Sequence, residues 1–199
     1  LQTKGINIVK YDTNFRIYLH QSLQKLGIRM SIRQVVMAPA EVYLTRFLLS
    51  ASPNELNIYM LLASVLYLAS KTEESPIHIR SILMEARNCW PEFIPNDFTK
   101  LAEFEFYVME ELNCHVVVHH PYRSLVQLGK TMGLMDLNNA WAIINDSYIT
   151  DVILLYPPHI IAIAAVCITV CTTDTKAGDM SEFLANSNIR IEEVAEVCN

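Results

Sequence analysis

Glycine is scarce in this chain, and the motifs that depend on it are missing. Only 5 of the 199 residues are glycine, too few for the Gly-rich loops that hold nucleotide phosphates. The sequence contains neither a GxSxG nor an HExxH motif, the signatures of α/β-hydrolases and of zinc proteases. We therefore expect a protein that is not an enzyme and has no cofactor.

Basic residues and paired cysteines are also in short supply. Lys and Arg number 15 against 21 Asp and Glu, which gives a formal net charge of −6 and argues against binding nucleic acid through its phosphates. The five cysteines form no CxxC pair, which indicates a reducing compartment. No apolar run reaches the roughly 20 residues of a membrane helix. We expect neither direct nucleic-acid binding nor a membrane span.

A group of histidines raises the question of a metal site. His115 and His119 lie four residues apart, with Cys114 and His120 beside them. The valines at 116–118 favour an extended connector, which would separate these side chains, whereas zinc needs its ligands to converge. Structural histidines are the better interpretation, and we expect no metal.

The sequence is rich in apolar residues at helical spacing. Hydrophobic residues make up 52% of the chain, which predicts an all-α protein with a sizeable core. From Leu56 to Ser70 no residue is charged and apolar side chains occur all round, so this run predicts a helix enclosed by other helices. The stretch 52–55 has the residues of a helix start, with Ser52 as the cap. The run ends in a charged cluster, 71–74, that is available to a partner.

The second half of the chain repeats this plan. Pro157 and Pro158 begin another apolar helix that runs to about Cys171, and residues 146–150 resemble residues 41–45. The repeat predicts two five-helix units, each wrapped around one central helix. We expect a lead-in at 1–11, a first unit at 12–115 and a second unit at 116–199 that is incomplete at its C-terminus, with one weak helix at 190–197.

The remaining helices follow from their caps and breakers. We expect helices over 12–26, 31–50, 76–88, 98–112, 121–133 and 136–155. Gly27 should end the first of these helices, Ser31 should cap the second, and Asp97 should cap the helix at 98–112. Pro39 falls inside the helix at 31–50, where we expect a kink or a break with a restart.

Lys71 is a candidate for partner binding. It follows Tyr67 and Leu68 on one helical face and precedes Glu74. A lysine there can simply complement the helix dipole, or it can donate to a partner's carbonyl groups beside Leu68. The acids of 101–112 supply a possible second charge, and spacing alone leaves both interpretations open.

At these residues the chain resembles the cyclins. The run Leu68–Glu74 (LASKTEE) is similar to the cyclin-box signature, and the stretch 105–115 is similar to the fifth cyclin-box helix and the residues after it. Five further stretches resemble C-type cyclins, at 90–95, 103–107, 119–123, 144–148 and 151–158. The resemblance covers about residues 11–171 and implies an all-α fold of tandem five-helix cyclin boxes.

The resemblance also implies a function and a site. C-type cyclins are nuclear regulatory subunits that bind and activate the Mediator-associated cyclin-dependent kinase, regulate transcription by RNA polymerase II, and assemble with other subunits of the Mediator kinase module. Lys71 and Glu105 would clamp the kinase, with Glu103 as the fallback acid, and we expect both clamp residues at helix surfaces. The surrounding contact positions would be Leu68, Glu74, Met109, Cys114 and Val116.

Two alternatives stay open, one within the class of binding proteins and one from another class. A cyclin-box transcription factor of the general-initiation type should carry a basic DNA-facing surface, which the acidic balance of the chain disfavours. An α-helical enzyme or apolar-ligand carrier should have polar groups converging inside its core. The two central helices offer as hydroxyl groups only Ser64, Ser70 and Thr169, apart from Tyr59 and Tyr67.

Overall fold

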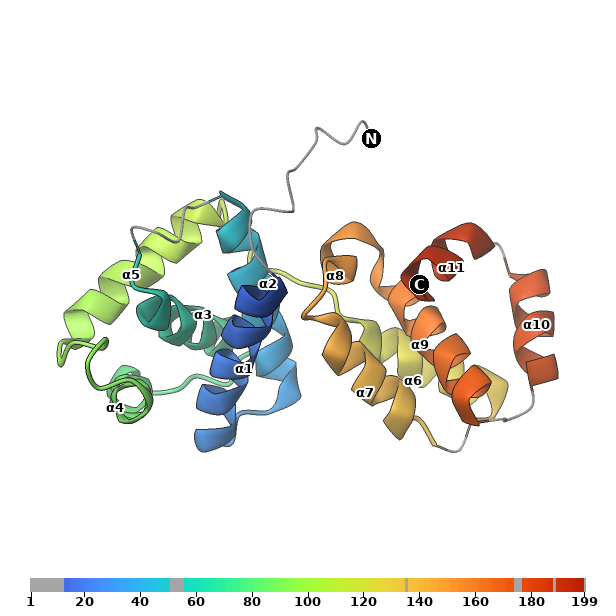
Figure 1. Cartoon of the computed structure of the whole chain (residues 1–199), viewed down its shortest axis with the longest axis horizontal. Coiled ribbons are helices and arrows are strands. Elements are labelled where there is room, and N and C mark those ends of the chain that lie inside the picture. Colours follow the sequence, from blue (N-terminus) through green and yellow to red (C-terminus); the bar gives the residue numbers. More distant parts are fainter. Residues whose placement is uncertain (1–12, 51–55, 135, 174–176, 188, 199) are drawn as a thin grey trace. The chain divides into compact units, whose positions relative to one another are not determined.

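The computed structural model describes residues 13–50, 56–134, 136–173, 177–187 and 189–198, and the regular elements in these ranges are all helices. The chain divides into two compact units, Leu1–Val118 and His119–Asn199 (Figure 1). We call them unit 1 and unit 2 and describe each by itself. The all-α fold expected from the sequence is confirmed.

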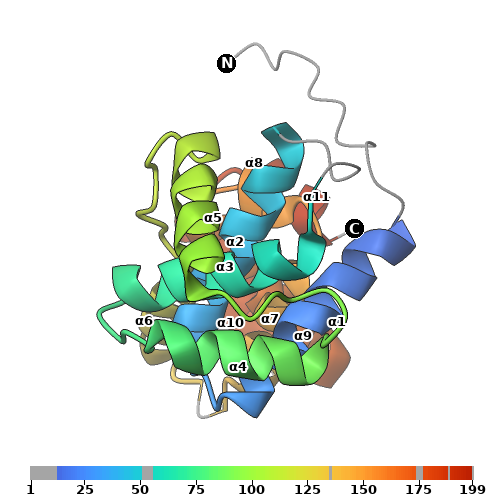
Figure 2. The ribbon, with the colours of Figure 1, turned by 90° about the vertical axis from the view of Figure 1, so that its left-hand side faces the viewer.

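Unit 1 is built around one enclosed helix. Its helices are α1 (Thr13–Arg29), α2 (Gln34–Ser50), α3 (Ile58–Thr72), α4 (Ile79–Cys89) and α5 (Phe98–Glu111). The other four helices all pack against α3, and Figure 2 shows α4 below it. Every residue of α3 from Met60 to Ser70 except Tyr67 is buried, so the predicted central helix is confirmed.

The helices of unit 1 begin at the predicted capping residues only in part. Asp97 caps α5 as predicted, because its side chain accepts from the Thr99 N–H at 2.9 Å. The side chain of Asn57 caps α3, whereas the predicted start at 52–55 lies outside the described residues, as does the lead-in at 1–11. The helix predicted to begin at about 76 begins at Ile79.

Two predictions about α1 and α2 are wrong. Gly27 does not end α1 but lies buried inside it. A Cβ at this position would overlap the side chain of Met37 on α2, so the absence of a side chain makes room for Met37. Ser31 does not cap α2, since it lies in a turn with φ +53° and the Arg33 carbonyl accepts the first helical bonds.

Pro39 is accommodated inside α2, which runs without a break from Gln34 to Ser50. The expected break with a restart is therefore wrong, and a kink at this position stays a prediction. Pro39 falls in the second turn, where it removes only the bond to the carbonyl of Val35, a residue exposed to water.

A polar pair is buried between α1 and α2. The Glu41 Oε2 atom lies 3.0 Å from the His20 Nδ1 atom, and both residues are buried. Burial raises the pKa of Glu41, and the interaction with His20 opposes this effect.

Unit 2 also surrounds an apolar helix. Its helices are α6 (Pro121–Met132), α7 (Asn138–Ser147), α8 (Val152–Leu155), α9 (Pro158–Thr173), α10 (Ala177–Asn186) and α11 (Ile191–Cys198). All the others pack against α9, in which every residue from Ile160 to Val166 is buried. Gly133 ends α6 in the left-handed conformation, as predicted.

Unit 2 departs from the sequence predictions in two places. The helix expected over 136–155 is interrupted after Ser147 by a turn, in which the Ile149 N–H donates to the Asp146 carbonyl and the Thr150 N–H to the Ser147 carbonyl, and α8 begins only at Val152. The helix α10 was not expected from the sequence. Among its described side chains, Met180 is the only apolar one that is strongly buried. None of the described helices is long and apolar enough to cross a bilayer.

Candidate functional site

The structure joins the end of α3 to the middle of α5 through a charged pair. The Lys71 ammonium contacts the Glu105 Oε1 atom, and the two side chains differ in exposure, at 41% for Lys71 and 9% for Glu105. The anion is therefore enclosed by the protein, whereas the cation lies at the rim. The pair forms within unit 1 itself.

The position of Lys71 is fixed by the way α3 ends. The Ser75 N–H donates to the Ser70 carbonyl at 2.9 Å, and Glu74 takes the left-handed conformation with φ +49°. The Ser70 hydroxyl donates to the Tyr67 carbonyl at 2.7 Å. The Lys71 Nζ atom lies 4.7 Å from the centroid of the Tyr67 ring, so the ammonium is held between an aromatic face and a carboxylate.

Glu105 lies on the buried side of α5. Its neighbours at helical spacing, Leu101 and Val108, are fully buried, and they face α3 with it. Placing a carboxylate on such a stripe is costly unless a cation accompanies it, and Lys71 supplies that cation. The expectation that both residues lie at helix surfaces is wrong for Glu105.

The segment between α5 and α6, residues 112–120, which we call the connector, is bonded to the end of α3 through Tyr43 of α2. The Tyr43 hydroxyl donates to the Val116 carbonyl at 2.5 Å and lies 3.1 Å from the Thr72 Oγ1 atom. Burial raises the pKa of Tyr43, so the phenol keeps the proton that this bond requires. The Arg46 guanidinium donates to the His115 carbonyl at 3.2 Å. The end of α3 and the connector are therefore held together by α2.

The other predicted contact residues lie around this pair at different depths. Leu68 is buried in the core, Met109 and Val116 are half-buried, and Cys114 and Glu74 are exposed. Cys114 has φ +57°, and its N–H donates to the Met109 carbonyl at 2.9 Å, which folds the connector back onto the end of α5.

Glu103 is not part of the cluster. It lies two residues before Glu105, so it points to another side of α5, and it is exposed. The structure therefore brings Lys71 together with Glu105 and leaves Glu103 apart.

Three residues of the region escaped the sequence analysis. Phe106 exposes 72% of its surface on α5, and Tyr43 and Arg46 reach the connector from α2. Tyr43 had a signal in the internal repeat, because its counterpart Tyr148 in unit 2 also bonds to a residue of the segment between α5 and α6, with its hydroxyl 2.7 Å from His120 Nδ1.

The histidines of the connector do not form a cluster with other metal-binding residues. The ring of His120 bonds to Tyr148, and the backbone carbonyl of His115 accepts from Arg46. Within the described ranges no group of three or more His, Cys, Asp or Glu residues could hold a metal ion.

Comparisons with known proteins give this arrangement a context. The chain is 55% identical over 175 residues to an RNA polymerase II holoenzyme cyclin-like subunit of Candida albicans, covering 82% of this chain and 40% of that protein. The subunit of the same name from Saccharomyces cerevisiae is 52% identical over 168 residues, covering 80% of this chain and 52% of that protein. The chain thus spans about half the length of these relatives.

Solved structures share the fold. A chain of the yeast RNA polymerase II CTD kinase CTDK-1 complex matches with a TM-score of 0.76 at 19% identity, covering 99% of this chain and 81% of that chain. A chain of the yeast TFIIK (Kin28/Ccl1/Tfb3) complex matches with a TM-score of 0.72 at 20% identity, covering 92% and 84%. At these identities the likeness shows the fold alone. Residues 4–117, more than half of the chain, match the family described as cyclin, N-terminal domain, and the chain therefore belongs to the cyclin family.

Proposed function

We propose that this chain is the regulatory subunit that binds and activates the Mediator-associated cyclin-dependent kinase in the nucleus and so regulates transcription by RNA polymerase II. Its relatives at 52–55% identity are named as cyclin-like subunits of the RNA polymerase II holoenzyme. In this proposal the kinase performs the phosphorylation and the cyclin contributes a rigid surface.

The observation that carries the proposal is the ion pair between Lys71 and Glu105. The ammonium has three N–H donors, and at the rim of the unit those not directed at Glu105 can donate to backbone carbonyls of a partner. Half-buried Met109 and exposed Phe106 supply apolar surface on the same helix as Glu105. A charged group fixed among apolar side chains is typical of a binding hot spot.

The proposed mechanism is a shift of population. The kinase alternates between arrangements in which its mobile C-helix lies outward or inward, and only the inward one forms the catalytic Lys–Glu pair. A cyclin surface that binds the inward arrangement more tightly than the outward one raises the population of the inward arrangement. The size of this shift is set by the difference between the two affinities. Because Lys71 is already held by Tyr67 and Glu105, little ordering of its side chain is left to occur on binding.

The test is a pull-down of the Mediator-associated kinase with this chain, followed by a kinase assay. Lys71→Ala and Glu105→Gln should each weaken binding by about 1–4 kcal/mol, as expected for a hot-spot charge. Glutamine is chosen because Glu105 is buried and alanine would leave a cavity. Lys130→Ala, at an exposed lysine of α6, is the matched control.

Each outcome bears on a different part of the proposal. Loss in both variants, with full binding of the Lys130→Ala control and an unchanged circular dichroism spectrum, supports the clamp. Wild-type affinity in both variants would remove the pair from the interface. No binding by the folded wild-type chain would refute the assignment to this kinase.

We further propose that residues 12–115 and residues 116–199 form two cyclin boxes, and that the second box binds other subunits of the Mediator kinase module. The support is the central helix α9, packed as α3 is, and the resemblance of 119–158 to C-type cyclins. Capture of those subunits by the wild-type chain and by the Lys71→Ala variant alike would separate this surface from the kinase clamp.

A further inference from the structure

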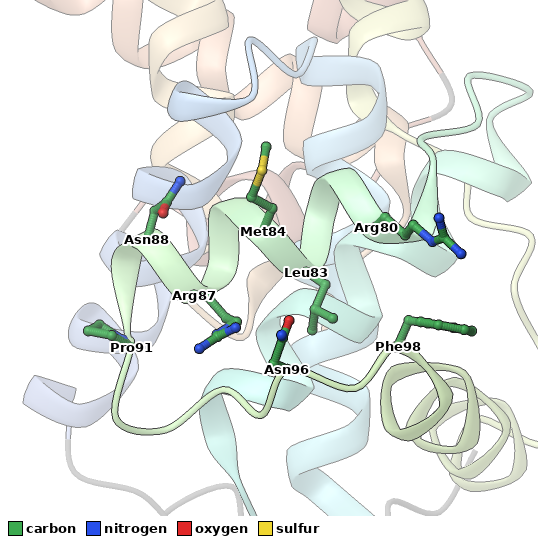
Figure 3. A pocket seen from close by; sticks show the side chains of 8 residues that line it. All are labelled: Arg80, Leu83, Met84, Arg87, Asn88, Pro91, Asn96 and Phe98. Atoms are coloured by element: carbon green, nitrogen blue, oxygen red, sulfur yellow. The ribbon is translucent and has the colours of Figure 1, made fainter.

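Unit 1 carries a hollow on the side of α4, away from the Lys71–Glu105 pair. It has a volume of about 540 Å³ and lies between α4, the loop at 90–97 and the start of α5 (Figure 3). We call it the α4 groove. Its lining includes Arg80, Leu83, Met84, Arg87, Asn96 and Phe98.

The groove is positively charged in a chain of net negative charge. Its lining holds two arginines and no Asp or Glu, although the chain as a whole carries −6. In the described part of the chain no carboxylate pairs with Arg80 or Arg87, whereas Arg29 binds Glu85 at 3.0 Å. The two guanidiniums therefore remain available to an external anion.

The guanidinium of Arg80 is also held in place. Its central carbon lies 5.4 Å from the centroid of the Phe98 ring, which is exposed at the start of α5. A stacked guanidinium keeps its donors in the plane of the fork and suits bidentate binding of a carboxylate. Phe98 thus orients the cation and adds apolar surface.

The spacing of the two arginines indicates the form of the ligand. Arg80 and Arg87 lie seven residues apart on α4, about 10 Å along one face at 1.5 Å per residue. In Figure 3 the first lies at the Phe98 end of the groove and the second at the Asn96 end, with Leu83 between them. Two separated single cations match two separate carboxylates better than one phosphate group, for which arginines converge.

A polyproline II segment fits this spacing. Its residues i and i+3 lie on one face, about 9 Å apart at 3.1 Å per residue. Two acidic residues three apart can therefore reach Arg80 and Arg87 together. An apolar residue between them would lie over Leu83 and beside Phe98.

We propose that the α4 groove binds an acidic, extended segment of a partner protein, with two carboxylates on Arg80 and Arg87 and an apolar side chain on Leu83 and Phe98. This docking surface is separate from the kinase clamp, since neither Lys71 nor Glu105 lines it. It would recruit a substrate or regulator without occupying the kinase-binding surface.

The test is fluorescence anisotropy with the full chain and a fluorescein-labelled peptide of Glu-Pro-Leu repeats. The Arg80→Glu/Arg87→Glu variant should bind the peptide at least about tenfold more weakly, because it replaces two attractive charges by repulsive ones. The matched control is Arg33→Glu/Lys130→Glu, which makes the same charge change at exposed residues of other elements. A peptide of Gln-Pro-Leu repeats tests the need for carboxylates.

A second variant leaves both arginines and the Phe98 stack in place. Asn96→Glu puts a carboxylate in the groove beside Arg87, where it should compete with the peptide and reduce its affinity by about as much as loss of one charge pair. This variant answers the question even if the double reversal disturbs α4, which circular dichroism would show.

The proposal requires binding of the Glu peptide that the groove variants lose and the control variant keeps. Equal loss in the control would reduce the effect to net charge and overturn the proposal. So would equal binding of the Gln peptide, the absence of binding to the wild-type chain, or binding only of a peptide with phosphoserine in place of the glutamates.

Discussion

Replacing Lys71 with methionine should destabilise unit 1, because the Glu105 carboxylate would remain buried without its cation. Removal of one partner from a fully buried ion pair costs about 3–5 kcal/mol, whereas exposed pairs contribute about 0–1 kcal/mol. Here one side chain is 9% exposed and the other 41%, so water reaches the pair from the lysine side. We expect the free energy of unfolding to fall by about 1–2 kcal/mol, between those limits.

The assay must report on unit 1 alone, since two compact units need not unfold together. Trp90 is buried in unit 1 and Trp141 belongs to unit 2. In a Trp141→Phe background, tryptophan fluorescence during urea unfolding follows unit 1. The Lys71→Met change should lower the urea midpoint without changing the slope, because the same surface is exposed on unfolding.

A double-mutant cycle identifies the cause. Glu105→Gln removes the charge that needs Lys71, so the double variant should lose less stability than the sum of the single variants, with a coupling of about 1 kcal/mol. The reasoning would be refuted by a Lys71→Met variant as stable as the wild type, or by strictly additive effects. Circular dichroism should show the same helix content in all four proteins.

Three further predictions concern residues of α1 and α2. Gly27→Ala should destabilise unit 1 by about 1 kcal/mol in urea unfolding, because the new Cβ overlaps the flexible end of the Met37 side chain, which must shift, and the same change should cost less in a Met37→Ala background, where those atoms are gone. Burial raises the pKa of Glu41, so the folded chain retains a proton that the unfolded chain releases. Stability should therefore fall as the pH rises from the ordinary glutamate pKa through this raised pKa, and Glu41→Gln should flatten that fall in unfolding curves taken across the range. Tyr43→Phe should cost about 1 kcal/mol of unfolding free energy and speed amide hydrogen exchange next to Val116, whose carbonyl would lose its donor; unchanged exchange would show that the bond does not hold the connector.

The central helices were predictable because their pattern leaves one solution. A run from Leu56 to Ser70 with no charge can be stable in water only inside a shell of other helices, and the structure provides that shell. Asp97 was equally informative, because its side chain bonds two residues away and needs no tertiary context. Signals of this kind lie within a short stretch of sequence, and the rest of the fold does not change them.

The errors come from features that depend on distant residues. Gly27 resembles a helix stop in sequence, but its role is to admit Met37 of another helix. The helix α10 has only ten residues, too few for a stable isolated helix, so its existence depends on packing against α9 rather than on its own pattern. Neither fact can be read from a short window of sequence.

Glu105 could be distinguished from the other acids of α5 by resemblance to the cyclins but not by spacing. The sequence of α5 contains Glu103, Glu105, Glu110 and Glu111, and spacing alone does not say which carboxylate is buried. Resemblance to the cyclins singled out Glu105, and the structure buries it opposite Lys71.

The burial of Glu105 separates two effects that a binding assay alone would combine. Because its carboxylate is desolvated during folding, a partner that binds at Lys71 does not have to remove water from it. Glu105→Gln should then change kinase affinity through the position and field of Lys71. Its effect on binding should persist when stability is restored by a compensating substitution elsewhere in unit 1. If the restored variant bound like the wild type, the pair would be a device for folding, and the recognition of the kinase would have to come from the apolar surface around it.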